Sequence, residues 1–137
     1  MVVLRHSCRI NGYDFINLTK LDVLDKLPEI KVAVKYIVEG KELVGFPGEL
    51  LIKTFVCVSN ESYRNPSADL ELLSKVEVEY VTLPGWQMSI EQITNYEDLP
   101  ENCKKYVEFI EEWTKVPIKW IGVGPLRESM LIKPRVV

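Results

Sequence analysis

This sequence has few of the residues on which most catalytic and metal sites depend. It contains one histidine, His6, and three widely spaced cysteines, Cys8, Cys57 and Cys103, with no C-x-x-C pair. The cysteine pattern therefore predicts free thiols in a reducing compartment rather than a zinc site or a disulfide framework. No Ser-His-Asp or Cys-His arrangement around His6 is convincing, so we expect it to pack or to face solvent rather than to catalyse a reaction.

Three other kinds of segment are also missing. There is no G-x-x-x-x-G-K-[ST] phosphate loop, and no apolar run approaches the length that a bilayer-spanning helix needs. Arg5, His6 and Arg9 interrupt the start of the chain before the apolar core of a signal peptide could form. The 17 basic and 20 acidic residues are mixed along the chain, so neither nucleic acid nor an anionic membrane is the expected partner. These absences together predict a cytoplasmic protein.

The chain does have enough apolar residues for one compact domain or for part of a larger one, with 47% of its 137 residues apolar. From residue 30 to 38 apolar and charged residues alternate, which predicts a strand, and Glu39-Gly40-Lys41 predicts a tight turn into a hairpin whose second strand spans 42–46. From residue 97 to 115 apolar residues recur every three or four positions, which predicts a helix with Pro100 in its first turn. A second helix is predicted over 2–11, ended by Gly12, and further strands over 15–18, 76–80, 118–123 and 129–133. In the strand over 76–80 the apolar residues, Tyr80 among them, alternate with glutamates that we expect on the outer face. Helices that alternate with strands indicate an α/β fold.

The segment Thr19-Lys20-Leu21-Asp22 directly follows a predicted strand, a position at which open α/β sheets bind ligands. The carboxylate of Asp22 could accept two hydrogen bonds from a guanine ring, which offers adjacent donors at N1 and N2, whereas adenine offers no such pair. The stem of Lys20 could cover the plane of the base. The alternative is an ordinary loop in which Asp22 caps a short helix that begins at Val23.

A second candidate, Gly122-Val123-Gly124-Pro125, also follows a predicted strand. Glycines allow backbone N–H groups to approach a ligand closely, so a base or a ribose could rest against this backbone. The alternative is a simple turn. Neither motif by itself distinguishes binding from local structure.

Taken together, several segments of this chain resemble adenylosuccinate synthetase, specifically the C-terminal third of the eukaryotic form. The first is Leu18-Thr19-Lys20-Leu21-Asp22-Val23-Leu24-Asp25, and the others follow it in family order. Each segment is common when taken singly, but the set is specific. The remaining segments span 29–32, 75–80, 83–86, 97–100, 116–124 and 127–130.

The resemblance implies a GTP-dependent ligation of IMP and L-aspartate in purine (AMP) biosynthesis, with Mg²⁺ and a homodimeric enzyme. It implies a mixed, largely parallel sheet with flanking helices and a β-hairpin. The implied GTP-binding residues are Lys20, Leu21, Asp22, Gly122, Val123 and Gly124. The family's phosphate loop and its catalytic Asp and His lie far upstream of these segments, so the chain is expected to carry no catalytic residue and no metal ligand.

Residues 48–65 depart from the family, in which the hairpin runs on quickly to the next strand. We expect this stretch to be an insertion, such as a translated intron, and the start at Met1 to reflect a truncated gene model; sequencing the mature transcript tests both ideas. The leading interpretation is an inactive C-terminal fragment, residues 1–137, that carries the guanine-recognition part of a GTP site. One alternative is a non-catalytic guanine-nucleotide-binding or interaction module that pairs with a full-length subunit. Another is a fragment whose exposed sheet edges favour aggregation.

Overall fold

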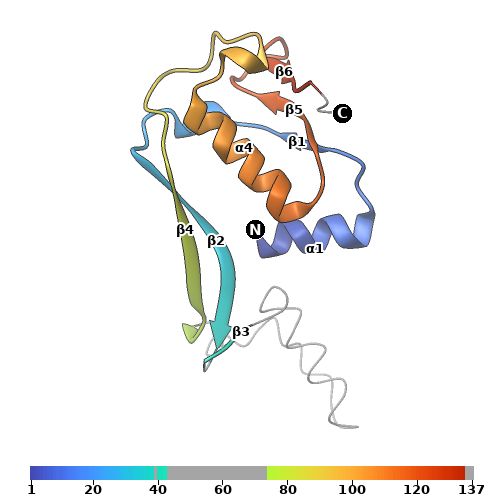
Figure 1. The fold of residues 1–137 in the computed structure, drawn as a ribbon, viewed down its shortest axis with the longest axis vertical. Coiled ribbons are helices and arrows are strands. Elements are labelled where there is room, and N and C mark those ends of the chain that lie inside the picture. The colour runs from blue at the N-terminus through green and yellow to red at the C-terminus, as the bar shows by residue number, and fades with distance from the viewer. Residues whose placement is uncertain (39, 43–73, 135–137) are drawn as a thin grey trace.

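The computed structural model describes residues 1–38, 40–42 and 74–134, and it confirms the predicted α/β class (Figure 1). Both the proposed insertion at 48–65 and the predicted continuation of the hairpin to residue 46 lie outside these ranges. The described strands form two sheets, ordered β1–β5–β6 and β3–β2–β4. The elements are α1 (Val2–Asn11), β1 (Ile16–Leu18), η1 (Leu21–Leu24), β2 (Glu29–Val38), β3 (Lys41–Glu42), β4 (Glu77–Pro84), η3 (Tyr96–Asp98), α4 (Glu101–Thr114), β5 (Ile118–Gly122) and β6 (Met130–Ile132).

The β1–β5–β6 sheet and α4 form the centre of the core. β1 runs parallel to β5, and β6 runs antiparallel to it. Figure 1 shows α4 packed on this sheet, with α1 beyond the carboxyl end of α4. The residues that α4 and the sheet bury together include Cys103, Val107, Ile110, Ile118, Ile121 and Leu131. Each such side chain contributes about 1.5–3 kcal/mol by leaving water, which makes this contact the main source of stability.

The helix α4 begins later than its apolar spacing predicts. Pro100 is its N-cap residue rather than a member of its first turn, and Leu99 before it is extended, with ψ 143°. The proline ring disfavours helical backbone at the preceding residue, so the chain forms the separate short helix η3 before α4 starts. At the other end Lys115 is left-handed (φ 60°) and donates its N–H to the Glu111 carbonyl at 2.8 Å. This geometry ends α4 at Thr114, as a left-handed cap does.

The strands β2 and β4 form a long antiparallel ribbon that runs past α4 and α1 (Figure 1). Ile30, Val32 and Val34 of β2 are buried, as the alternation predicts. Tyr80 of β4, however, is 54% exposed, although the same alternation placed it on the inner face. Val81 pairs with the buried Val32, so the alternation of side chains along β4 turns Tyr80, which pairs with Ala33, to the outer face.

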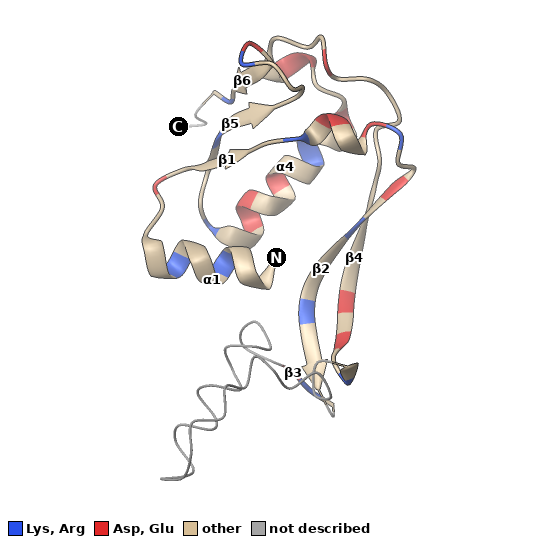
Figure 2. Ribbon diagram, turned by 180° about the vertical axis from the view of Figure 1, so that it is seen from behind, with Lys and Arg blue, Asp and Glu red and all other residues tan. Residues whose placement is uncertain are grey.

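The far end of the ribbon is charged, as the blue and red segments of β2 and β4 in Figure 2 show. Lys35 lies 3.4 Å from Glu79 and 3.8 Å from Glu42, and all three side chains are more than a third exposed. Exposed ion pairs of this kind add little to the free energy of unfolding, so their main effect is to keep the end of the ribbon solvated.

The helix α1 matches its prediction because its end is decided locally. Gly12 is left-handed (φ 62°), and its N–H donates to the Cys8 carbonyl at 3.0 Å. No helix within the described ranges is long and apolar enough to cross a membrane.

Candidate functional site

The structure brings the two predicted binding segments to one edge of the β1–β5–β6 sheet. Because β1 and β5 are parallel, with Leu18 opposite Ile121, the residues that follow both strands leave the sheet side by side. The contact is close, since a Cβ placed on Gly122 would lie 3.3 Å from the Cα of Thr19. Two segments that are far apart in the sequence thus form one surface beyond the carboxyl ends of parallel strands, where α/β sheets bind ligands.

In the first segment only two of the three predicted side chains are accessible. Lys20 is exposed and Asp22 is half-buried, whereas Leu21 is 1% exposed and belongs to the core. Lys20 has a left-handed backbone (φ 63°), which is uncommon for a residue with a side chain and turns the chain sharply from β1 into η1. We infer that this turn places Lys20 and Asp22 on either side of a buried anchor.

The carboxylate of Asp22 does not cap a helix. The short helix η1 begins two residues earlier than expected, at Leu21, with Lys20 as its N-cap residue and no side-chain cap bond. Within the ranges that the structure describes, no hydrogen bond or ion pair reaches the Asp22 carboxylate. Both of its oxygens therefore remain free to accept hydrogen bonds from a ligand.

In the second segment, residues 122–125, the backbone packs closely against the rest of the protein. Val123 is fully buried, and its N–H donates to the Ser129 carbonyl at 2.9 Å. A Cβ on Gly124 would lie 2.9 Å from the Ser129 hydroxyl oxygen and 3.1 Å from Cγ of Glu91. The Val123 side chain is therefore a core position, and what this segment offers to a ligand is its glycine backbone.

Asp25 is a residue whose role the sequence did not reveal. One of its carboxylate oxygens accepts a hydrogen bond from the indole N–H of Trp86 at 2.8 Å, and the other accepts one from the Ile90 N–H at 3.2 Å. Asp25 thus ties the end of η1 to the segment after β4, which holds the Lys20–Asp22 turn in place. The partners lie more than sixty residues away in the chain, so no local pattern signals this contact.

The described cysteines are structural. Cys8 and Cys103 are both free and buried. Burial, with a smaller contribution from the nearby Asp25 carboxylate, raises the pKa of Cys103 to about 12, so its thiol stays protonated and unreactive at neutral pH. Cys57 lies outside the described residues.

The described part of the chain contains no cluster of side chains that could hold a metal ion by itself. No three His, Cys, Asp or Glu side chains gather there closely enough to hold one. The accessible groups at the shared sheet edge include the Lys20 ammonium, the carboxylates of Asp22 and Glu91, and the Thr19 hydroxyl beside the glycine backbone.

Comparison with known proteins gives a consistent picture. The family described as adenylosuccinate synthetase matches residues 1–131. Adenylosuccinate synthetase 1 of Laccaria bicolor is 62% identical over 133 residues, and the adenylosuccinate synthetase of Coprinopsis cinerea is 58% identical over 133 residues. Each of these alignments covers 97% of this chain and 26% of the relative, so the chain spans about a quarter of their length. The solved structure of fully ligated adenylosuccinate synthetase from Plasmodium falciparum matches with a TM-score of 0.72 and 36% identity, covering 96% of this chain and 27% of that one.

Proposed function

Because the chain belongs to the adenylosuccinate synthetase family, whose members are ligases of purine biosynthesis, we propose that it supplies the guanine-recognition part of a GTP site. In a complete synthetase this site serves the GTP-dependent joining of IMP and L-aspartate in the cytoplasm. The GTP-binding residues of the proposal are Lys20, Asp22 and the backbone of Gly122 and Gly124, with Leu21 and Val123 as the buried anchors beneath them.

One observation carries the proposal: the parallel pairing of β1 with β5 places Thr19–Asp22 against Gly122 at one sheet edge. A guanine ring that lies over this edge can donate its N1 and N2 hydrogens to the Asp22 carboxylate, which has no other partner among the described residues. The Lys20 stem covers one face of the ring. The glycines leave room for the ring or its ribose to approach the backbone.

Isothermal titration of the purified chain with GTP, and with ATP for comparison, tests the proposal. We expect GTP to bind more tightly than ATP, and Asp22→Ala to weaken GTP about 10- to 100-fold, because hydrogen bonds to a charged group contribute about 1.5–3 kcal/mol. The matched control is Asp14→Ala, which removes an exposed carboxylate from the loop before β1 and should leave binding unchanged. Equal affinities for GTP and ATP, or an Asp22→Ala protein that binds GTP normally, would refute the assignment.

The isolated chain is proposed to be inactive. Phosphoryl transfer depends on positioned charge around the phosphates, and this chain has no phosphate loop. No three His, Cys, Asp or Glu side chains gather among the described residues, and the resemblance to the family places the magnesium ligands outside this chain. We expect no adenylosuccinate to form from GTP, IMP and L-aspartate when the chain is assayed alone. Turnover by the purified chain that disappears in Asp22→Ala would show that this expectation is wrong.

Two further points belong to the same proposal. Residues 48–65 are an insertion relative to the family, and the chain pairs either with itself or with a full-length subunit. An assay of intact synthetase with and without added chain separates a regulatory or assembly role, which changes the rate, from that of an inert fragment, which does not.

A further inference from the structure

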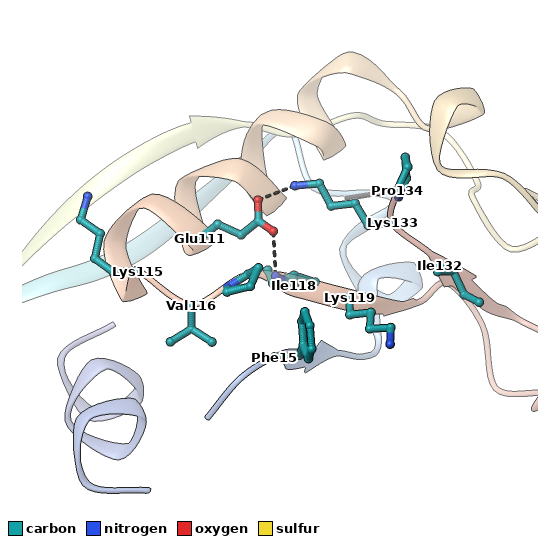
Figure 3. A pocket seen from close by; sticks show the side chains of 10 residues that line it. Phe15, Glu111, Lys115, Val116, Ile118, Lys119, Ile132, Lys133 and Pro134 are labelled. Carbon is teal, nitrogen blue, oxygen red and sulfur yellow. Dashed lines mark hydrogen bonds and ion pairs between the residues drawn. The ribbon is translucent and has the colours of Figure 1, made fainter. Parts of the chain in front are cut away.

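A hollow of about 670 Å³ lies at the edge of the β1–β5–β6 sheet opposite the proposed GTP site (Figure 3). Because β1 and β5 are parallel, the residues at their amino ends also meet, and here they bring Phe15 together with Ile118. Ile132 at the end of β6 and Val116 after α4 complete the apolar walls. We call this hollow the amino-edge pocket. Its volume falls within the roughly 300–1,000 Å³ typical of small-molecule sites.

The single acidic side chain that lines the amino-edge pocket is already neutralised. One oxygen of Glu111 accepts a hydrogen bond from the Ile118 N–H at 2.7 Å, and the other forms an ion pair with Lys133 (Figure 3). The two side chains are only 20% and 11% exposed, so the pair is shielded from solvent. Glu111 and Lys133 therefore act together as a neutral part of the wall.

Two cationic side chains remain. Lys115 and Lys119 both line the pocket, and neither forms an ion pair within the described part of the chain. The carboxyl end of α4 also lies here and carries partial negative charge, which the Lys115 ammonium at that end offsets. The charge left for a ligand is positive.

Lys119 is held in place by an irregularity in the sheet. Ile16 is opposite Ile118 but Asn17 is opposite Trp120, so Lys119 is the extra residue of a bulge. Its ammonium lies 5.0 Å from the centre of the Phe15 ring and 4.6 Å from that of Trp120. Contact with two aromatic rings fixes the position of this charge, and its remaining N–H groups can still bind an anion.

The amino-edge pocket shares no lining residue with the proposed GTP site. The two sites lie at opposite edges of the same sheet, one at the amino ends and one at the carboxyl ends of β1 and β5.

We propose that the amino-edge pocket binds a small aromatic carboxylate. The ring would lie against Phe15, Val116 and Ile132, and the carboxylate would pair with the ammonium group of Lys119, beside Phe15. Lys115 lies at the opposite end of the pocket and its ammonium points away from it (Figure 3). Apolar walls with a few placed charges are the usual composition of such sites, and charge-assisted hydrogen bonds give them selectivity for anions.

Titration of the ¹⁵N-labelled chain with 2-naphthoate, followed by amide chemical shifts, tests the proposal. We expect saturable shifts confined to the amides around Phe15, 116–119 and 132–133, with a dissociation constant on the order of 1 mM for a probe of this size. The neutral analogue 2-naphthamide should bind about two- to fivefold more weakly, because one exposed ion pair contributes up to about fivefold. GTP should not compete, since its proposed site is at the other edge.

Substitutions make the test specific. Lys119→Met keeps the apolar stem and removes the charge, so naphthoate should then bind no better than naphthamide. The control is Lys105→Met, an exposed lysine of α4 that pairs with Glu101 and does not line the pocket. Ile132→Asp, at a side chain that is 65% exposed, should abolish naphthoate binding without unfolding the chain. Shifts scattered over the surface, or equal binding of both probes to the unmodified chain, would overturn the proposal whether or not GTP binds.

Discussion

A Gly85→Ala protein is expected to lose about 3 kcal/mol or more of its free energy of unfolding. A Cβ at residue 85 would lie 1.8 Å from the carbonyl oxygen of Leu27 and 2.9 Å from its carbonyl carbon. The obstacle is backbone rather than a flexible side chain, and the Gly85 N–H already donates to the Pro28 carbonyl at 2.9 Å. The chain can make room only by separating the β4 end from the loop before β2, and overpacking of this kind is among the larger single-residue effects.

Urea unfolding followed by tryptophan fluorescence measures the loss, with Gly12→Ala as the control. Gly12 has a positive φ of 62° but nothing within 4 Å of the site of a Cβ, so its substitution should cost only the strain of a left-handed alanine, about 1 kcal/mol. If the two substitutions cost the same, backbone conformation rather than close contact would explain the requirement for glycine at residue 85.

The second large effect is expected at Leu21. The resemblance to the synthetases gives this residue a place in the GTP site, but its side chain is 1% exposed and packs in the core. Leu21→Ala should therefore lower the free energy of unfolding by about 3 kcal/mol, as large-to-small substitutions in cores do.

The neighbouring Val23→Ala provides the comparison. Val23 is 65% exposed, so its truncation should change stability by no more than about 0.5 kcal/mol. Unfolding in urea and titration with GTP should be measured on the same samples. A Leu21→Ala protein of normal stability that no longer binds GTP would show that Leu21 faces the ligand instead of anchoring the turn.

Elements with local signals were predictable from the sequence. The helix α1 ends at Gly12 because a left-handed residue stops a helix whatever surrounds it, and β2 follows the alternation of Ile30, Val32 and Val34 because one face of the ribbon is buried. The resemblance to the adenylosuccinate synthetases was also readable, since it rests on segments that keep their order along the chain.

Elements decided by pairing were less predictable. Tyr80 faces outward because its neighbour Val81 pairs with the buried Val32, and that pairing depends on how two strands align across the ribbon rather than on either strand alone. The predicted start of α4 was wrong by a few residues. Pro100 was predicted to lie in the first turn, but Leu99 is extended and Pro100 is the N-cap residue.

The candidate site shows the same division. The residue types suited to a guanine ring, Asp22 with Lys20 and the glycines at 122 and 124, were visible in the sequence by themselves, because donor and acceptor chemistry belongs to the side chain. Which of them face a ligand was decided only by the tertiary structure. The parallel pairing of β1 with β5 brings the two segments together, burial turns Leu21 and Val123 into anchors, and Asp25 fixes the turn through a distant indole. These features depend on contacts between residues far apart in the chain. A local sequence pattern does not indicate which distant segment will pack against it.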